Sequence, residues 1–105
     1  MKTTFAQEVY ELIRSIPKGK VSTYKEVAKA IGKPKAVRAV GQVLKANRHP
    51  DKTPCYKIVR SDGSLGGYCG SDPKNISRKE RLLKRDGIKV VDGKVDLRKY
   101  LYRFR

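Results

Sequence analysis

Residues 23–46 read TYKEVAKAIGKPKAVRAVGQVLKA and contain two helical patterns separated by a turn. Thr23 followed three residues later by Glu26 is a capping-box sequence, which predicts that a helix begins here. Gly32 predicts its end, because glycine readily adopts the left-handed conformation that follows a helix C-terminus. A second amphipathic pattern spans residues 35–46. Two short helices joined by a tight turn are typical of a helix-turn-helix.

The residues before this unit predict a further helix. Residues 5–16 carry apolar side chains at helical spacing, and Thr3 or Thr4 supplies the cap. Pro17 and Gly19 end the pattern. The segment is therefore predicted to be an amphipathic helix.

The residues after the helix-turn-helix predict a β hairpin, or wing. Residues 56–59 are strand-like, residues 61–63 have the composition of a turn, and residues 64–68 predict the second strand. The expected fold class is therefore mainly α with small β hairpins, a winged helix-turn-helix. A chain of this length is expected to form a single domain over residues 1–105.

Three more elements are expected towards the C-terminus. Ser77 and Glu80 form a second capping-box sequence, which opens a helix that Gly87 closes. Residues 90–95 predict a small hairpin on an Asp-Gly turn. Residues 100–105 alternate aromatic or apolar with polar side chains, and for them packing as a strand is favoured over binding to nucleic acid.

The charge of the chain predicts a polyanionic partner. Lysine and arginine number 26 against 10 acidic residues, which gives a formal net charge of +16. DNA, RNA and acidic membranes all satisfy such a surface, because each releases counterions when a basic side chain binds it. The alternative is that the excess only keeps the protein in solution or reflects a thermophilic or basic proteome.

The sequence shows neither export nor metal-binding signals. It has no apolar run near the ~20 residues that cross a bilayer and no signal-peptide core, so the protein is expected in the cytoplasm, associated with the nucleoid, and not in a membrane. Cys55 and Cys69 are accordingly expected to be free thiols. Together with His49 they do not show a recognised ligand spacing, so no metal site is expected.

The second helix of a helix-turn-helix enters a DNA groove, and this predicts the DNA-facing side chains. A solvated polar face on a core helix is the alternative. The candidate DNA contacts are Lys35, Arg38, Gln42, Lys45, Asn47 and Arg48.

Several spaced motifs together resemble the C-terminal domain of the O6-alkylguanine-DNA alkyltransferases. The resemblance covers about residues 5–87. The residues that carry it are Lys18-Gly19-Lys20-Val21-Ser22-Thr23-Tyr24, Ala36-Val37-Arg38-Ala39-Val40-Gly41, Asn47, Pro54-Cys55 and Gly63-Ser64-Leu65-Gly66-Gly67-Tyr68.

This resemblance implies that the helix-turn-helix binds the minor groove of double-stranded DNA as a monomer. It also implies that an alkylated guanine is flipped into a pocket beside a reactive cysteine, because the alkylated oxygen is not open to in-line attack inside the stack. By position, Arg38 fills the gap left by the base, and Tyr24 contacts the phosphate and the base. Asn47 braces the site, and Cys55 accepts the alkyl group in a single turnover without a cofactor.

Other residues near the cysteine complete the expected site. Lys57 adds positive charge, which favours ionisation of a thiol whose ordinary pKa is about 8.5. Lys57, Gly66 and Tyr68 are also expected to contact DNA. Cys69 falls where the family often has a small hydroxyl residue in the base pocket, with a small packing group as the alternative.

The sequence departs from the family directly after the cysteine. The family's general-base histidine is replaced by Tyr56, a poor base at neutral pH because the ordinary pKa of tyrosine is about 10. Asp86 stands where the family has the glutamate that orients that histidine, and its shorter side chain is expected to weaken the relay. His49 is a candidate substitute base, with an exposed loop histidine or a phosphate contact favoured.

Four functions follow from these observations. The first is alkyl transfer from guanine to Cys55. The second is a non-enzymatic sensor that holds the lesion for another repair pathway, which the missing histidine favours. The third is a winged-helix regulator that does not flip bases, and the fourth is a repair module that depends on other DNA repair proteins.

Overall fold

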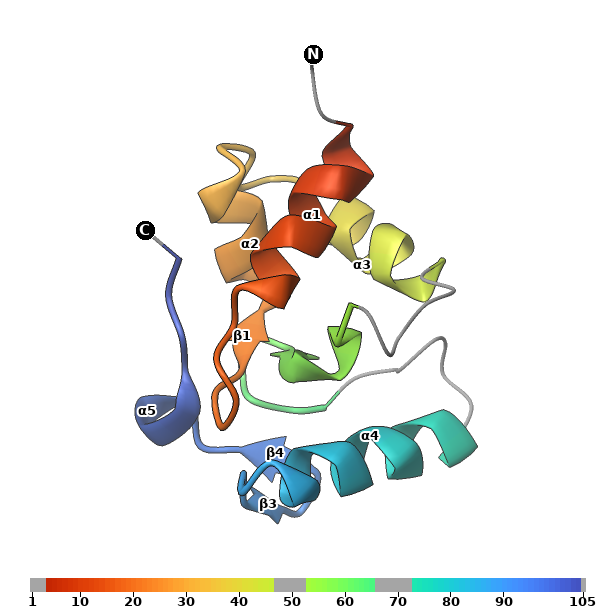
Figure 1. Cartoon of the computed structure of the whole chain (residues 1–105), viewed down its shortest axis with the longest axis vertical. Helices are drawn as coiled ribbons and strands as arrows, with labels where there is room; N and C mark the ends of the chain where they lie inside the picture. Colours follow the sequence, from red (N-terminus) through yellow and green to blue (C-terminus); the bar gives the residue numbers. More distant parts are fainter. Residues whose placement is uncertain (1–3, 47–52, 66–72, 105) are drawn as a thin grey trace.

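The computed structural model describes residues 4–46, 53–65 and 73–104, without the side chains of residues 73–75. In Figure 1 the helices between residues 5 and 45 form the upper part of the molecule, and the helix of residues 73–85 crosses below them. In the described residues no helix is long and apolar enough to cross a membrane. The elements are α1 Phe5–Arg14, β1 Ser22–Thr23, α2 Tyr24–Ala30, α3 Val37–Lys45, the 3-10 turn η1 Cys55–Lys57, β2 Ile58–Val59, α4 Pro73–Arg85, β3 Val90–Val91, β4 Lys94–Val95 and α5 Leu97–Tyr100.

Helix α1 confirms the first predicted helix. The Thr4 hydroxyl accepts from the Gln7 amide at 3.1 Å, and the Gln7 side chain accepts from the Thr4 amide at 2.8 Å. These two bonds satisfy amides that a helix start leaves without partners. Val9 and Ile13 point into the core from this helix.

Helices α2 and α3 confirm the predicted helix-turn-helix. The Thr23 hydroxyl accepts from the Glu26 amide at 3.0 Å. The carboxylate of Glu26 instead lies 3.6 Å from Lys29 and 3.5 Å from Arg103, so the reciprocal half of the expected capping box is wrong. Gly32 ends α2 with a φ of +85°, as predicted.

Helix α3 begins at Val37, two residues later than the sequence predicts. The Ala36 amide donates to the Lys33 carbonyl at 2.8 Å, which closes a turn around Pro34. Lys35 therefore lies in this turn, before the helix.

The predicted wing hairpin differs from the structure in the residues that can be compared. Residues 55–57 form η1, and β2 pairs in parallel with β1, with Ser22 opposite Ile58. The turn itself closes as predicted, because the Arg60 amide donates to the Ser64 carbonyl at 2.9 Å. The chain then pairs with β4, where Ser64 forms a bridge with Lys94. The rest of the expected second strand, 66–68, lies outside the described residues.

Helix α4 begins at Pro73, so the predicted start at Ser77 is wrong. Ser77 lies one turn inside the helix, where its hydroxyl cannot cap the first amides, while proline is compatible with a first helical position. Gly87 ends the helix with a φ of +84°, as predicted. The Ile88 amide donates to the Leu83 carbonyl at 3.0 Å, and both side chains are buried.

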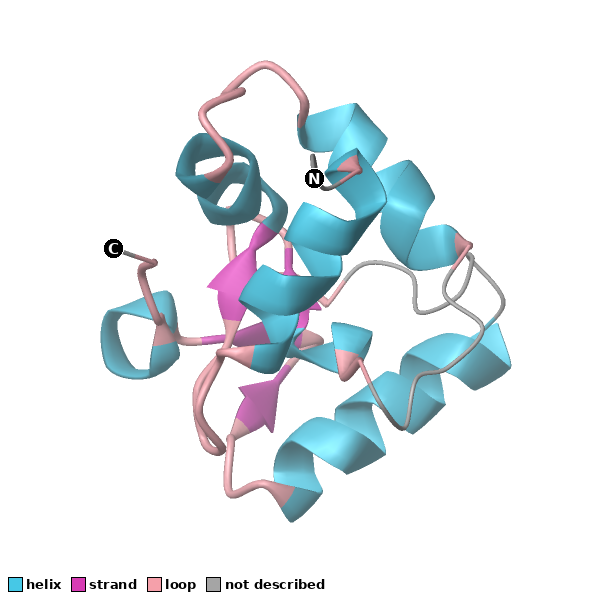
Figure 2. Cartoon of the chain, turned by 45° about the horizontal axis from the view of Figure 1, so that its top comes forward, coloured by secondary structure: helices cyan, strands magenta, loops and turns pink. Residues whose placement is uncertain are grey.

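The C-terminal hairpin confirms its prediction. Strands β3 and β4 are antiparallel, and Asp92 and Gly93 at the turn have φ of 52° and 71°. Positive φ at both central residues matches the right-handed twist of the strands. The following tail packs against the body, since Leu101 forms a parallel bridge with Val21. In Figure 2 the helices lie around a small central group of strands.

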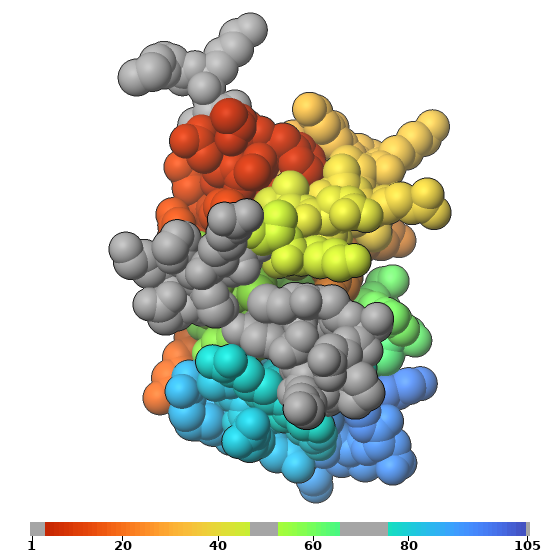
Figure 3. All heavy atoms as spheres, turned by 90° about the vertical axis from the view of Figure 1, so that its right-hand side faces the viewer, coloured from red at the N-terminus to blue at the C-terminus, as the bar shows by residue number. Residues whose placement is uncertain are grey.

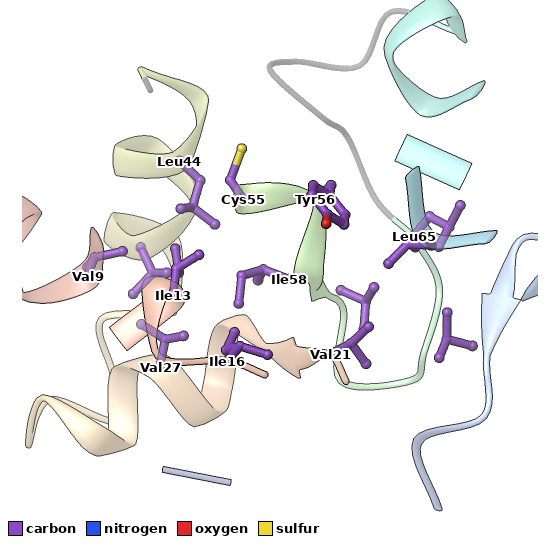
Figure 4. Packing of buried hydrophobic residues seen from close by; sticks show 14 of the residues in the cluster. Val9, Ile13, Ile16, Val21, Val27, Leu44, Cys55, Tyr56, Ile58 and Leu65 are labelled. Carbon is purple, nitrogen blue, oxygen red and sulfur yellow. The ribbon is translucent and has the colours of Figure 1, made fainter. Parts of the chain in front are cut away.

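The core joins the three N-terminal helices to the segment that carries the cysteine. Figure 4 shows Val9 and Ile13 of α1, Val27 of α2 and Leu44 of α3 gathered on one side of Ile58. This packing sets the position of η1 relative to the helix-turn-helix.

Candidate nucleic-acid interface and cysteine site

Cys55 lies at the start of η1, where local hydrogen bonds shape the turn. Its amide donates to the Thr53 carbonyl at 2.8 Å. The buried Thr53 hydroxyl accepts from the Arg14 guanidinium at 3.1 Å, so α1 holds this turn in place. Cys55 is 4% exposed, and in Figure 4 its sulfur points away from Ile58.

The β1–β2 pairing places Tyr24 beside Arg60, and its hydroxyl lies within electrostatic range of Cys55. It is the first residue of α2 and follows Thr23, which pairs with Val59. Burial raises the pKa of the Tyr24 hydroxyl, the Cys55 sulfur raises it further, and Arg60 opposes both. The hydroxyl therefore stays protonated at neutral pH and can donate a hydrogen bond.

A hollow of about 330 Å³ opens beside Tyr24. Lys25 and Arg60 supply its positive charge, and Val37 of α3 forms part of its wall. Sequence reasoning missed Arg60, which it placed next to a turn. No short stretch of sequence marks Arg60, because the β1–β2 pairing is what brings it beside Tyr24.

Tyr56 and Asp86 form a hydrogen-bonded pair. The Tyr56 hydroxyl donates to an Asp86 carboxylate oxygen at 2.5 Å. Burial raises the pKa of Tyr56, and the hydrogen bond to Asp86 and its negative charge raise it further, to about 12. Arg85 lowers this pKa and so opposes the other effects. The longer reach of tyrosine closes the gap that the short Asp86 side chain was expected to leave. Tyr56 is therefore a donor at neutral pH and not a base.

We expect Tyr56→Phe to destabilise the fold by about 2 kcal/mol at pH 8, because a bond to a charged acceptor is lost. The raised pKa favours the protonated form in the native state, so this contribution is present below pH 10 and is lost as the pH rises through about 12. Urea unfolding of both proteins at pH 8 and pH 11 measures it. A difference that stays constant between these pH values would contradict the prediction.

Lys57 does not lie where a DNA contact requires it. It is 8% exposed, and its ammonium donates to the Ile16 carbonyl at 2.9 Å. Burial lowers the pKa of Lys57, with Asp86 opposing. The expectation that Lys57 contacts DNA is therefore wrong. Its ammonium forms a hydrogen bond inside the protein, which joins η1 to the residues directly after α1.

Lys79 is a structural contributor that sequence reasoning missed. It is 1% exposed, and its ammonium donates to the carbonyls of Ile58 and Leu65, each at 2.5 Å. It therefore ties α4 to β2 and to the segment after the 60–63 turn. The available signal was its spacing, because Lys79 shares a helix face with Ile76 and Leu83.

Helix α3 presents a polar face made of exposed residues spaced four and three apart. These are Arg38, Gln42 and Lys45, and Lys35 is exposed in the preceding turn. Val40 and Leu44 are buried on the other side, and the Tyr10 hydroxyl donates to the Val43 carbonyl at 3.1 Å, which holds α3 against α1. Six further candidates lie outside the described residues, namely Asn47, Arg48, His49, Gly66, Tyr68 and Cys69.

Comparison with known proteins matches residues 4–88 to a family described as "6-O-methylguanine DNA methyltransferase, DNA binding domain". A bifunctional methyltransferase/endonuclease of Picrophilus torridus is 44% identical over 94 residues. This alignment covers 90% of the chain but 30% of that protein. The chain thus spans less than a third of the length of this curated relative.

Two solved structures are similar over most of the chain. S. pombe Atl1 in complex with damaged DNA containing O6-carboxymethylguanine has a TM-score of 0.87 and 27% identity, and the match covers 99% of this chain and 100% of that one. Mycobacterium tuberculosis OGT in complex with DNA has a TM-score of 0.73 and 36% identity, over 83% of this chain and 51% of that one.

Proposed function

The chain belongs to the 6-O-methylguanine DNA methyltransferase family, and on this premise we propose that it repairs DNA by flipping O6-alkylguanine and accepting the alkyl group on Cys55. The observation that carries the proposal is a helix-turn-helix whose α3 exposes Arg38, Gln42 and Lys45 and whose first residue, Tyr24, is within electrostatic range of Cys55. Tyr24 opens the helix-turn-helix, and its pKa responds to the Cys55 sulfur. A base displaced from the duplex beside α2 would therefore meet both a hydrogen-bond donor and a nucleophile.

In this proposal the exposed face of α3 enters the minor groove of duplex DNA. Arg38 occupies the space that the flipped guanine leaves, while Lys35 and Lys45 contact phosphates. The hollow with Lys25 and Arg60 takes the backbone next to the flipped nucleotide. Such contacts release counterions, so binding weakens steeply with salt.

The chemistry is a displacement at the alkyl carbon. The Cys55 thiolate forms a sulfur–carbon bond as the bond between that carbon and guanine O6 breaks. The electron pair goes to the guanine, which then takes a proton, and the protein keeps a stable thioether. Tyr24 is positioned to donate a hydrogen bond to the guanine, which stabilises the leaving base.

The test is the intact mass of the protein after incubation with duplex DNA that carries O6-methylguanine. Transfer adds the mass of one methyl group, and Cys55→Ser should abolish the increase while retaining DNA binding. Cys69→Ser is the matched control and should keep it. An unchanged mass together with lesion-selective binding would reject transfer.

We expect the transfer rate to rise about tenfold per pH unit between pH 6 and the thiol pKa, because the thiolate is the nucleophile and Tyr56 remains protonated there. Single-turnover kinetics over pH 6 to 9 measure this dependence. A rate that is already level at pH 6.5 would mean that another group takes the proton. His49→Gln would then show whether that group is His49.

The second candidate is a sensor that binds O6-alkylguanine without transfer and passes it to other repair proteins. Two observations favour it. Tyr56 is a hydrogen-bond donor to Asp86 where the family has a general base, and the chain matches Atl1 over the full length of that chain. The mass measurement separates the two candidates.

A further inference from the structure

The C-terminal segment carries a concentration of positive charge beyond the family match, which ends at residue 88. Residues 89–105 contain six lysines and arginines against two aspartates. A hollow of about 380 Å³ lies in this segment, and Lys89, Lys94 and Lys99 are among its lining residues. All three lysines are exposed, so their charges are available to a ligand.

Tyr100 organises this hollow. The Lys99 ammonium lies 5.5 Å from the centre of the Tyr100 ring, and the Tyr100 hydroxyl accepts from the Lys89 amide at 3.2 Å. The aromatic side chain therefore holds the backbone of one lysine and the ammonium of another around a common opening. One ammonium against the Tyr100 ring, with two further lysine side chains in the same lining, suits an anionic group such as a phosphate.

This hollow adjoins the one beside Tyr24. Asp62 lines both, so the two hollows lie on either side of the 60–63 turn. The connection is rigid, because the Val95 amide donates to the Gly63 carbonyl at 2.9 Å and the Leu65 amide to the Gly93 carbonyl at 3.1 Å. Along the right-hand edge of Figure 3, the yellow, green and blue segments follow one another from top to bottom.

The exposed Asp62 carboxylate lies between the hollows and stays ionised at neutral pH. Hydrogen bonds from the Ser64 hydroxyl and amide lower the pKa of Asp62, and the charge of Lys94 lowers it further. A chain of phosphates that passes this turn therefore meets one ionised carboxylate, with Lys94 and Lys99 in the hollow on one side of it and Lys25 and Arg60 in the hollow on the other.

We infer that the hollow with Lys94 and Lys99 is a second DNA-contact site, which holds a backbone phosphate of the duplex that α3 enters. This inference rests on the proposed DNA-binding function. It extends the surface that contacts DNA past the 60–63 turn. A continuous polyanion is favoured over an acidic protein segment, because its regularly spaced phosphates match two adjoining hollows that both contain basic side chains. The hollow contributes affinity and not lesion recognition, since it is separated from Cys55 by the turn.

The test compares Lys94→Gln/Lys99→Gln with Lys18→Gln/Arg81→Gln. The second pair removes the same charge from exposed residues that line neither hollow. Binding to an undamaged duplex of about two helical turns (~20 base pairs) is measured by fluorescence anisotropy at several salt concentrations. The first variant should lower the magnitude of the slope of log K against log salt by about 2, about 1 for each lysine removed from the DNA contact, and the control by much less.

A slope that is unchanged, or that falls equally in both variants, would overturn the second site. Preference for O6-methylguanine over guanine, measured on the same duplex, should be equal in wild type and variant. If that preference is absent in the wild type while the slopes still differ, lesion recognition fails and the second DNA site stands. If an acidic peptide binds the wild type and the DNA slopes do not differ, the hollow serves a protein partner and the inference is wrong.

Discussion

Lys79→Met is expected to lower the free energy of unfolding by about 3 to 5 kcal/mol. The substitution keeps most of the side-chain volume but removes a buried donor from two carbonyl groups. Each buried acceptor that loses its partner costs about 1 to 3 kcal/mol, and removing one side of a buried polar contact is among the largest single-residue effects. Because the carbonyls belong to Ile58 and Leu65, both β2 and the segment after the 60–63 turn should loosen.

Urea unfolding followed by circular dichroism measures the change, with Arg81→Met as the control. Arg81 is exposed on the same helix, so its substitution should change stability by less than about 0.5 kcal/mol. Equal effects of the two substitutions would mean that the buried ammonium does not hold α4 in place.

Gly63→Ala is expected to destabilise the protein by about 3 kcal/mol or more. Gly63 has a φ of +89°, and a Cβ built there would lie 2.4 Å from the Val95 carbonyl oxygen. The left-handed conformation alone costs about 1 to 2 kcal/mol for a residue with a Cβ. The contact with backbone cannot be relieved by a rotamer change, so the turn and β4 must separate. The bond between the Val95 amide and the Gly63 carbonyl would be lost with that movement.

Gly32 provides a matched control for this prediction. Its φ of +85° is nearly the same, but a Cβ there would meet nothing within 4 Å. Gly32→Ala should therefore show only the conformational part, about 1 kcal/mol. Thermal unfolding of both variants separates the cost of the left-handed conformation from the cost of the steric clash with Val95. Similar losses of stability would show that the clash is relieved without cost.

The elements that the sequence predicted correctly have signals only a few residues long. The cap at Thr4, the cap at Thr23 and the end of α2 at Gly32 each depend on bonds between residues three to five positions apart. The same holds for the turn of the C-terminal hairpin. Such signals fail where the same residues are compatible with two structures. The capping-box sequence at Ser77 is compatible with a helix start, but it lies inside a longer helix.

The candidate site was predictable in part. Cys55 and Tyr24 stand in motifs whose order can be read along the chain, and the structure places them close together. The DNA contact expected of Lys57 could not be judged from local sequence, because its partner, Ile16, is 41 positions away. The Tyr56–Asp86 bond spans 30 positions. A charged residue that the sequence suggests is exposed can thus form a buried hydrogen bond that joins two segments.

The amino-acid order alone determined the helix-turn-helix, its caps, the positive charge and the presence of a cysteine behind a proline. These properties depend on backbone preferences and on composition, which act over one or two turns of chain. Tertiary structure decided that β2 pairs with β1, that Lys57 is buried, and that Tyr56 donates to Asp86. Those outcomes depend on how segments far apart in the sequence pack against each other and are buried. Such long-range packing leaves no signal in any short stretch of residues.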